Sequence, residues 1–170
     1  MPNYNIFSFC KNIMNKISCA IIGHRKLYLT DILKIKIFKS IIYLINNEKV
    51  NVFLFGSNSE FTDYCYEVIT KLKETYKNIQ RVYVRAEYPY VNESYIKHLE
   101  NFYENSYYFD KNLRSFKSVY VKRNQVMIDN SEYCLFYYNE NLYKNKSSGT
   151  KLAYNYAISK NKSIINVLNN

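Results

Sequence analysis

The sequence is poor in the residues that mark loops and linkers: it has three glycines, two prolines and no tryptophan in 170 residues. This excludes collagen-like and low-complexity composition. No apolar run approaches the ~20 residues of a membrane-spanning helix. The first ten residues lack a charged region, so we expect no signal peptide and no membrane partner. The length fits one domain with a single sizeable core.

The four cysteines form no CxxC pair, and neither His24 nor His98 lies near one at a zinc-ligand spacing. We therefore expect no metal site and no cofactor. Cys19 and Cys134 lie in apolar, strand-like runs, where a reduced cysteine behaves as a small hydrophobic residue. This usage favours a reducing cytoplasm over a disulfide scaffold.

The formal net charge is +10, which suits anionic partners such as nucleotides, nucleic acid or a membrane surface. A solvated lysine surface explains the charge equally well. The lysines are scattered, and no block of five or more like charges occurs. A dedicated polybasic arm is therefore not expected.

Short apolar runs alternate with longer segments of helical periodicity. Strands that are apolar on both faces and alternate with helices predict a doubly wound, mostly parallel sheet covered on both sides, as in Rossmann-like α/β folds. The expected strands are 18–22, 50–55, 81–86, 132–138 and 163–167, and the expected helices are 30–46, 60–78, 119–130 and 150–160.

Two segments stand outside this alternation. Residues 87–118 are polar and rich in tyrosine, and they are too long for an ordinary connection. We interpret them as an insertion after the third strand, helical near 93–104, that reaches over one end of the sheet. Residues 1–17 form an N-terminal extension with helical periodicity, and residues 18–170 form the single domain.

All three glycines fall between a strand and a helix: Gly23 in GHRK, Gly56 in GSNSEF and Gly149 in SSGT. Each glycine alone would only permit a tight turn. Because the carboxyl ends of parallel strands share one edge of the sheet, three such loops predict a binding rim. Their backbone N–H groups and helix N-termini attract phosphate.

Charged and polar side chains accompany these loops. His24 and Arg25 follow the first strand, and Arg25 can bind a phosphate or carboxylate in a bidentate manner. Arg123 and Asn124 lie in an otherwise apolar helix, where an inward arginine needs an anionic partner. The alternative is that Arg123 points to solvent beside Lys122. The predicted ligand-binding residues are Gly23, His24, Arg25, Gly56, Ser57, Asn58, Ser59, Glu60, Arg123, Asn124, Ser148, Gly149 and Thr150.

Standard nucleotide fingerprints are absent. The hydroxyls of Ser147, Ser148 and Thr150 can cap a helix or bind a phosphate, but no GK[ST] follows as in a Walker A loop. No GxGxxG precedes a helix, which argues against a standard NAD site.

The order of GHRK, G-S-x-S-EF, YVKRNxxMIDNSEYCLFYY and SGTxxAxxYAxxK resembles the SLOG superfamily. This group includes the cytokinin-activating phosphoribohydrolases and the DNA-processing protein of natural transformation. The resemblance covers residues 18–167 and is strongest to small bacterial members. It implies a nucleotide pocket in which Arg123 matches the family's arginine before methionine, and Gly149 and Thr150 match its Gly-Thr.

The chain departs from the phosphoribohydrolases at the catalytic positions. Lys151, Leu152 and Ala153 follow the Gly-Thr, where those enzymes carry glutamate. Cleavage of an N-glycosidic bond then lacks its general acid/base unless Glu60 or Asp63 enters the pocket.

These observations favour a cytoplasmic protein that binds a nucleotide or nucleotide-derived ligand, as a sensor or sequestering protein. The first alternative is a hydrolase of nucleotide or ribosyl N-glycosides, and its catalytic residues are unknown. The second is a DNA-binding protein, which the net charge supports and the scattered lysines disfavour. We predict a homodimer, because the apolar extension and the tyrosine-rich segment offer more hydrophobic surface than a small monomer usually exposes. The resemblance implies the same, since SLOG proteins commonly dimerise.

Overall fold

A computed structural model describes residues 16–86, 93–108, 116–143 and 148–169 of the chain. These residues form a six-stranded sheet in the order β4-β3-β2-β1-β5-β6, and every neighbouring pair of strands is parallel. The strands are β1 (Ser18–Gly23), β2 (Val52–Phe55), β3 (Gln80–Arg85), β4 (Asn105–Tyr108), β5 (Tyr133–Tyr137) and β6 (Ser163–Asn166).

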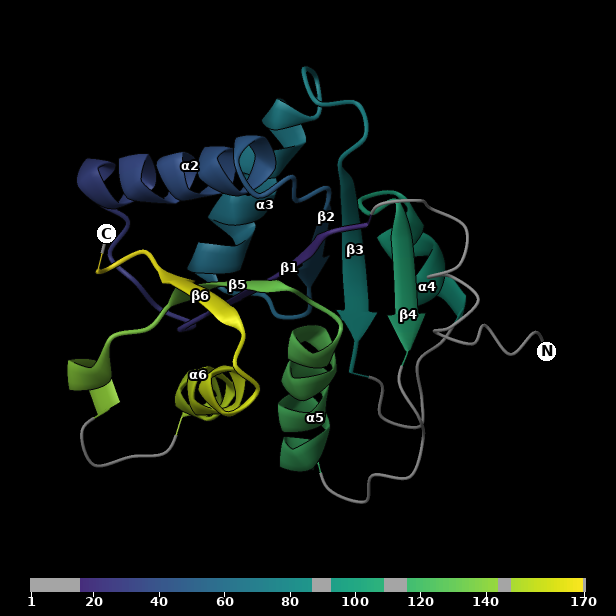
Figure 1. The fold of residues 1–170 in the computed structure, drawn as a ribbon. Coiled ribbons are helices and arrows are strands. Elements are labelled where there is room, and N and C mark those ends of the chain that lie inside the picture. Colours follow the sequence, from purple (N-terminus) through teal and green to yellow (C-terminus); the bar gives the residue numbers. More distant parts are fainter. Residues whose placement is uncertain (1–15, 87–92, 109–115, 144–147, 170) are drawn as a thin grey trace.

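Helices cover both faces of the sheet, with α2 and α3 on one side and α5 and α6 on the other (Figure 1). The helices are α2 (Asp31–Asn46), α3 (Glu60–Leu72), α4 (Glu93–Glu100), α5 (Phe116–Asp129) and α6 (Gly149–Ser159), with a short 3-10 helix η1 (Glu140–Tyr143). The Rossmann-like, doubly wound fold predicted from the sequence is therefore confirmed.

Each face of the sheet has its own core. Alternate strand residues such as Phe53 and Leu135 pack with α2 and α3, whereas their neighbours Leu54 and Phe136 pack with α5 and α6. Leu99 places α4 on the same side as α2 and α3. This arrangement explains why the strands are apolar on both faces.

The segment 87–118 contains more regular structure than the sequence predicts. The expected helix is present as α4, but Asn105–Tyr108 also form a strand, which pairs only with β3. Its sequence, NSYY, has no apolar run because an edge strand need not be buried on both faces. The described part of the segment thus extends the sheet sideways as a helix–strand unit. Residues 87–92 and 109–115, and the predicted N-terminal helix within residues 1–15, lie outside the described residues.

The amino edge of the sheet is held by side-chain interactions. Glu48 accepts hydrogen bonds from the hydroxyls of Tyr43 and Tyr133. Glu104, just before β4, forms salt bridges with Arg81 (2.6 Å) and Lys73 (2.9 Å). These contacts join α2 to β5 and β3 to β4 at the end opposite the predicted binding rim.

Candidate functional site

The candidate site lies at the carboxyl edge of the sheet, around the ends of β1, β2 and β5. The chain runs from β1 outward to β4 on one side, and then continues with β5 on the other side of β1. The strand order therefore reverses between β1 and β5, and such a switch point is where doubly wound sheets bind ligands. The predicted glycine loops follow β1 and β2, and the third precedes α6.

Gly23 and His24 sit at this switch point. A Cβ on Gly23 would come within 2.4 Å of Phe61 Cδ1, so the glycine allows α3 to pack closely on β1. His24 is 2% exposed, and its Nε2 accepts a hydrogen bond from the backbone N–H of Asn139 (3.1 Å). This bond ties the loop after β1 to the loop after β5. Burial lowers the pKa of His24, which suits a ring nitrogen that must keep its lone pair.

The loop after β1 is also held by α3. Glu60 Oε2 accepts a hydrogen bond from the backbone N–H of Leu27 (3.1 Å), and Glu60 N–H donates to Arg25 O (3.4 Å). The Arg25 side chain itself is exposed. Glu60 therefore positions the loop that carries Arg25.

The loop after β2 begins α3 with a capping box. Ser59 Oγ accepts from Thr62 N–H and Thr62 Oγ1 accepts from Ser59 N–H, so the two residues satisfy each other's backbone donors. Thr62 also donates to Ser57 O. Asn58 is the exposed residue of this loop. Ser57 and Ser59 thus shape the helix N-terminus, which remains suited to an anion.

Arg123 of α5 lies directly against Gly56 at the end of β2. A Cβ on Gly56 would come within 2.8 Å of Arg123 Cδ and Nε and within 2.7 Å of Met127 Sδ. Arg123 is only 6% exposed, so it does not point to solvent beside Lys122. The sequence left these two orientations open, and the structure selects the inward one.

The surroundings of Arg123 are neutral or cationic. Its Nε and a terminal nitrogen donate to Asn124 Oδ1 (3.3 and 3.1 Å), and its guanidinium lies 5.3 Å from the centre of the Tyr120 ring. Burial lowers the pKa of Arg123, and the nearby charge of Arg25 lowers it further. Among the described residues, no carboxylate forms a salt bridge with Arg123.

Three tyrosines outside the predicted ligand-binding residues complete this environment. Tyr83, Tyr95 and Tyr120 are close enough to Arg123 to raise its pKa, against the effect of burial. Tyr83 also hydrogen-bonds to Tyr95, and its hydroxyl lies 3.4 Å from Gly56 O. Tyr83 and Tyr95 come from β3 and α4, so no local motif could have linked them to residue 123. Tyr120 lies three positions before Arg123 in α5, where the helical spacing could have indicated it.

The third predicted loop contributes the start of α6. Ser148 caps this helix by accepting from Lys151 N–H (3.1 Å), and Thr150 is buried. Gly149 is exposed, and a Cβ there would meet nothing within 4 Å. The structure therefore gives Ser148 a capping role at the start of α6.

The predicted residues thus fall into two groups. Gly56 and Asn124 contact the buried side chain of Arg123, and the charge of the exposed Arg25 acts on it from the loop after β1. His24 joins the β1 and β5 loops. The remaining residues shape the loops and helix N-termini of the same edge.

Within the described residues, no cluster of His, Cys, Asp or Glu could hold a metal ion, and Cys19, Cys65 and Cys134 are buried free thiols. No helix in the described parts is long and apolar enough to cross a membrane.

Comparison with solved structures supports the fold. The structure is similar to the X-ray structure of the structural-genomics target TM1055, with a TM-score of 0.53, 10% sequence identity, and coverage of 87% of this chain and 72% of that chain. No family model and no curated protein matches the sequence. At this identity the likeness concerns the fold alone, and with the strand order it defines a Rossmann-like α/β protein.

Proposed function

We propose that this protein binds a nucleotide or nucleotide-derived ligand at the carboxyl edge of the sheet, as a sensor or sequestering protein of the SLOG type. The observation that carries the proposal is the buried guanidinium of Arg123 against Gly56. A charge that is 6% exposed and has a neutral amide as its hydrogen-bond partner is costly to bury. An anionic group of a ligand would offset that cost.

The geometry favours a phosphate as this anion. The charge of Arg25 disfavours the charged form of Arg123, and one multiply charged group would stabilise both guanidiniums. The N-terminus of α3 begins in the loop that follows Gly56, and helix N-termini favour anions as well. The tyrosines beside Arg123 offer hydroxyls and rings to the rest of a nucleotide.

The proposal is tested by the ligand dependence of the melting temperature. Mononucleotides, cyclic nucleotides and ADP-ribose derivatives are added to the full chain, and at least one should raise Tm. Calorimetry with that ligand should then show that Arg123→Ala weakens binding about tenfold or more, since a charge-assisted contact contributes about 1.5–3 kcal/mol. Lys122→Ala, at the exposed neighbouring position, is the matched control.

Three outcomes would contradict the proposal. The first is that no compound in the panel shifts Tm. The second is equal binding by the wild type and Arg123→Ala, which would remove Arg123 from the site. The third is binding of DNA in preference to nucleotides, with a steep salt dependence and little loss from any single substitution, as expected for contacts spread over many phosphates.

A further inference from the structure

The outward face of α2 carries large apolar side chains. Ile32, Ile35 and Phe38 follow one another at three-residue spacing and are 71%, 54% and 45% exposed. Residues at this spacing lie along one side of a helix, and the outer side of a surface helix is normally polar. Three neighbouring exposed residues of this size form an apolar ridge, which marks an interaction surface rather than ordinary exposure.

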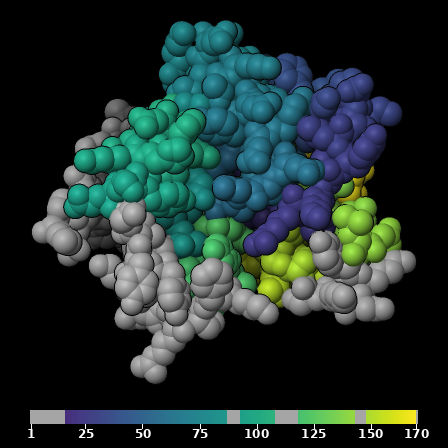
Figure 2. Space-filling model, turned by 180° about the vertical axis from the view of Figure 1, so that it is seen from behind, coloured from purple at the N-terminus to yellow at the C-terminus, as the bar shows by residue number. Residues whose placement is uncertain are grey.

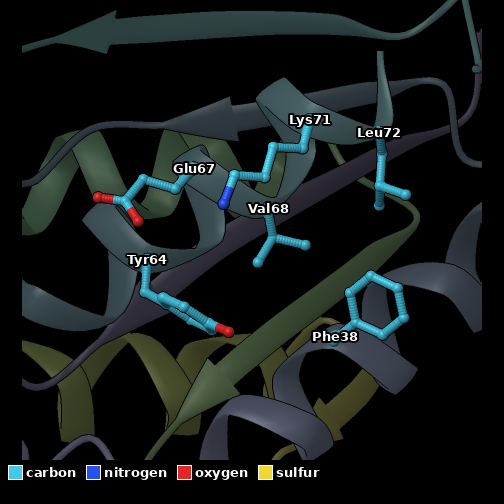
Figure 3. Close-up of a pocket in the computed structure, with 6 residues that line it drawn as sticks. All are labelled: Phe38, Tyr64, Glu67, Val68, Lys71 and Leu72. Atoms are coloured by element: carbon cyan, nitrogen blue, oxygen red, sulfur yellow. The ribbon is translucent and has the colours of Figure 1, made fainter. Parts of the chain in front are cut away.

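A groove lies beside this ridge, between α2 and α3, and Figure 3 shows the side chains that line it. The atoms of the two helices form part of the surface seen in Figure 2. The volume of the groove is about 310 Å³, and Phe38 at the edge of the ridge also forms one of its walls. The groove is lined by Phe38, Tyr64, Glu67, Val68, Lys71 and Leu72. The surface therefore offers a projecting apolar ridge and a partly apolar hollow next to each other.

The two helices differ in charge. On α2 the lysines Lys34, Lys36 and Lys39 outnumber the single acidic residue, whereas α3 begins with Glu60, Asp63 and Glu67. Partial burial, together with the carboxylates of Glu67 and Glu60, raises the pKa of Asp63. Within the described residues, neither Lys39 nor Glu67 forms a salt bridge. Lys34 pairs with Asp31 of the same helix (3.2 Å), and Lys71 lies beside Glu67 in the groove. Lys36 and Lys39 still make α2 mainly basic, and Asp63 and Glu67 make the first two turns of α3 mainly acidic.

We propose that a second copy of this chain docks on this surface, with the ridge of each α2 (Ile32, Ile35 and Phe38) packed over the α2–α3 groove of the other. A surface that presents both a ridge and a groove can complement itself about a two-fold axis. The same rotation brings the lysines of α2 towards the carboxylates of α3. The tyrosine-rich segment and the N-terminal extension are then not required for the contact.

Charge favours a second copy over a lipid surface. The lysines of α2 beside apolar residues would suit an anionic membrane, but the carboxylates of α3 adjoin them on the same face and would be repelled by it. In a dimer, the lysines of each α2 would face the carboxylates of the other copy's α3, so charges of both signs would find partners. Ile35, Lys39 and Glu67, which the tests change, are not among the proposed ligand-binding residues, so this inference and the proposed ligand site can fail separately.

The first test is the mass of the full chain in sedimentation velocity over a broad range of concentration. We expect a reversible dimer of the 20.4 kDa chain. Ile35→Glu should raise the dimer dissociation constant at least tenfold, because it places a charge in the centre of the contact. Ile158→Glu, at a 53%-exposed isoleucine of α6, should leave it unchanged. Circular dichroism establishes that both variants are folded.

The second test exchanges charges. Lys39→Glu and Glu67→Lys should each weaken the dimer, and the double variant should recover most of the wild-type affinity because opposite charges face each other again. A double variant that is as weak as the sum of the single ones would overturn the proposed orientation.

Other occupants of the surface give different results. A wild-type chain that stays monomeric at every concentration overturns the proposal. A dimer that is insensitive to Ile35→Glu, or one that is lost only on deletion of residues 1–16, assigns the contact to another segment. Binding of a monomer to phosphatidylserine vesicles that Ile35→Glu abolishes would identify a membrane-facing surface instead.

Discussion

The side chain of Arg123 occupies the space that a side chain at residue 56 would need. A Cβ on Gly56 would lie 2.8 Å from Arg123 Nε, closer than side chains normally approach. Gly56 needs no left-handed backbone, since no glycine among the described residues has a positive φ. The absence of a side chain at Gly56 leaves space for Arg123, whose guanidinium is therefore buried at the end of β2.

Gly56→Ala should therefore displace Arg123 and Met127. Overpacking of this kind costs about 1–3 kcal/mol in the free energy of unfolding. Chemical denaturation measures this loss, and ligand binding should weaken with it. Gly149→Ala is the matched control: a Cβ there meets nothing within 4 Å, and the change should raise stability by about 0.4–1 kcal/mol. A Gly56→Ala variant as stable as the wild type would show that Arg123 adapts freely.

Arg123→Met should separate stability from binding. Methionine keeps the length of the side chain and removes a charge that burial disfavours, as the lowered pKa of Arg123 indicates. We expect stability to rise by about 1–2 kcal/mol, in the range seen when buried charges are replaced by apolar residues, while nucleotide binding is lost. The measurements are denaturation without ligand and calorimetry with it. A destabilised Arg123→Met variant would show that the guanidinium stabilises the fold by itself.

Gly23→Ala should destabilise the domain through Phe61. The new Cβ would lie 2.4 Å from Cδ1 and 2.8 Å from Cγ of a ring that is fully buried. A loss of about 1–3 kcal/mol is expected. Phe61→Leu removes the ring, so the double variant should be more stable than the sum of the two single effects, with a coupling of about 0.5–3 kcal/mol. Strict additivity in denaturation experiments would place the strain elsewhere.

His24 should make stability depend on pH. Burial lowers its pKa in the folded state below the value of about 6.5 expected for the unfolded chain. As the pH falls below about 6.5, the unfolded chain binds the proton first, so the His24 contribution to stability shrinks until the folded protein is protonated too. Urea unfolding at several pH values should show this loss in the wild type and in His98→Gln, but not in His24→Gln. Parallel pH profiles for all three chains would exclude His24 as the source.

The sheet could be predicted from the sequence because its interior strands are continuous apolar runs. Runs such as Val52–Phe55 are apolar throughout, and only a strand covered on both faces requires this. The edge strand Asn105–Tyr108 follows no such rule and was missed. Element ends shifted for local reasons: the helix predicted over 60–78 ends at Leu72, and the chain then turns before β3.

Only those parts of the site that depend on residues close together in the sequence could be predicted. Glycines after strands located the loops, and an arginine in an apolar helix suggested an inward guanidinium. The contact of His24 with Asn139 spans 115 positions in the chain, and the approach of Tyr83 and Tyr95 to Arg123 depends on how three elements meet. Such contacts follow from the packing of the whole domain, and no spacing in the sequence encodes them.

The side-chain interactions at the amino edge imply that β3, β4 and β5 are locally more stable where they begin than where they end. Glu48 accepts hydrogen bonds from Tyr43 and Tyr133 at that edge, and Glu104 forms salt bridges with Arg81 and Lys73 there. The loops of the carboxyl edge are joined mainly by hydrogen bonds between neutral groups, such as the one from Asn139 to His24 and the pair between Tyr138 and Asn166. Amide hydrogen exchange should accordingly be slow where the strands begin and faster in the loops where they end. A ligand at the carboxyl edge would then protect the part of the domain that opens most readily, and it could be detected by exchange before any change in global unfolding.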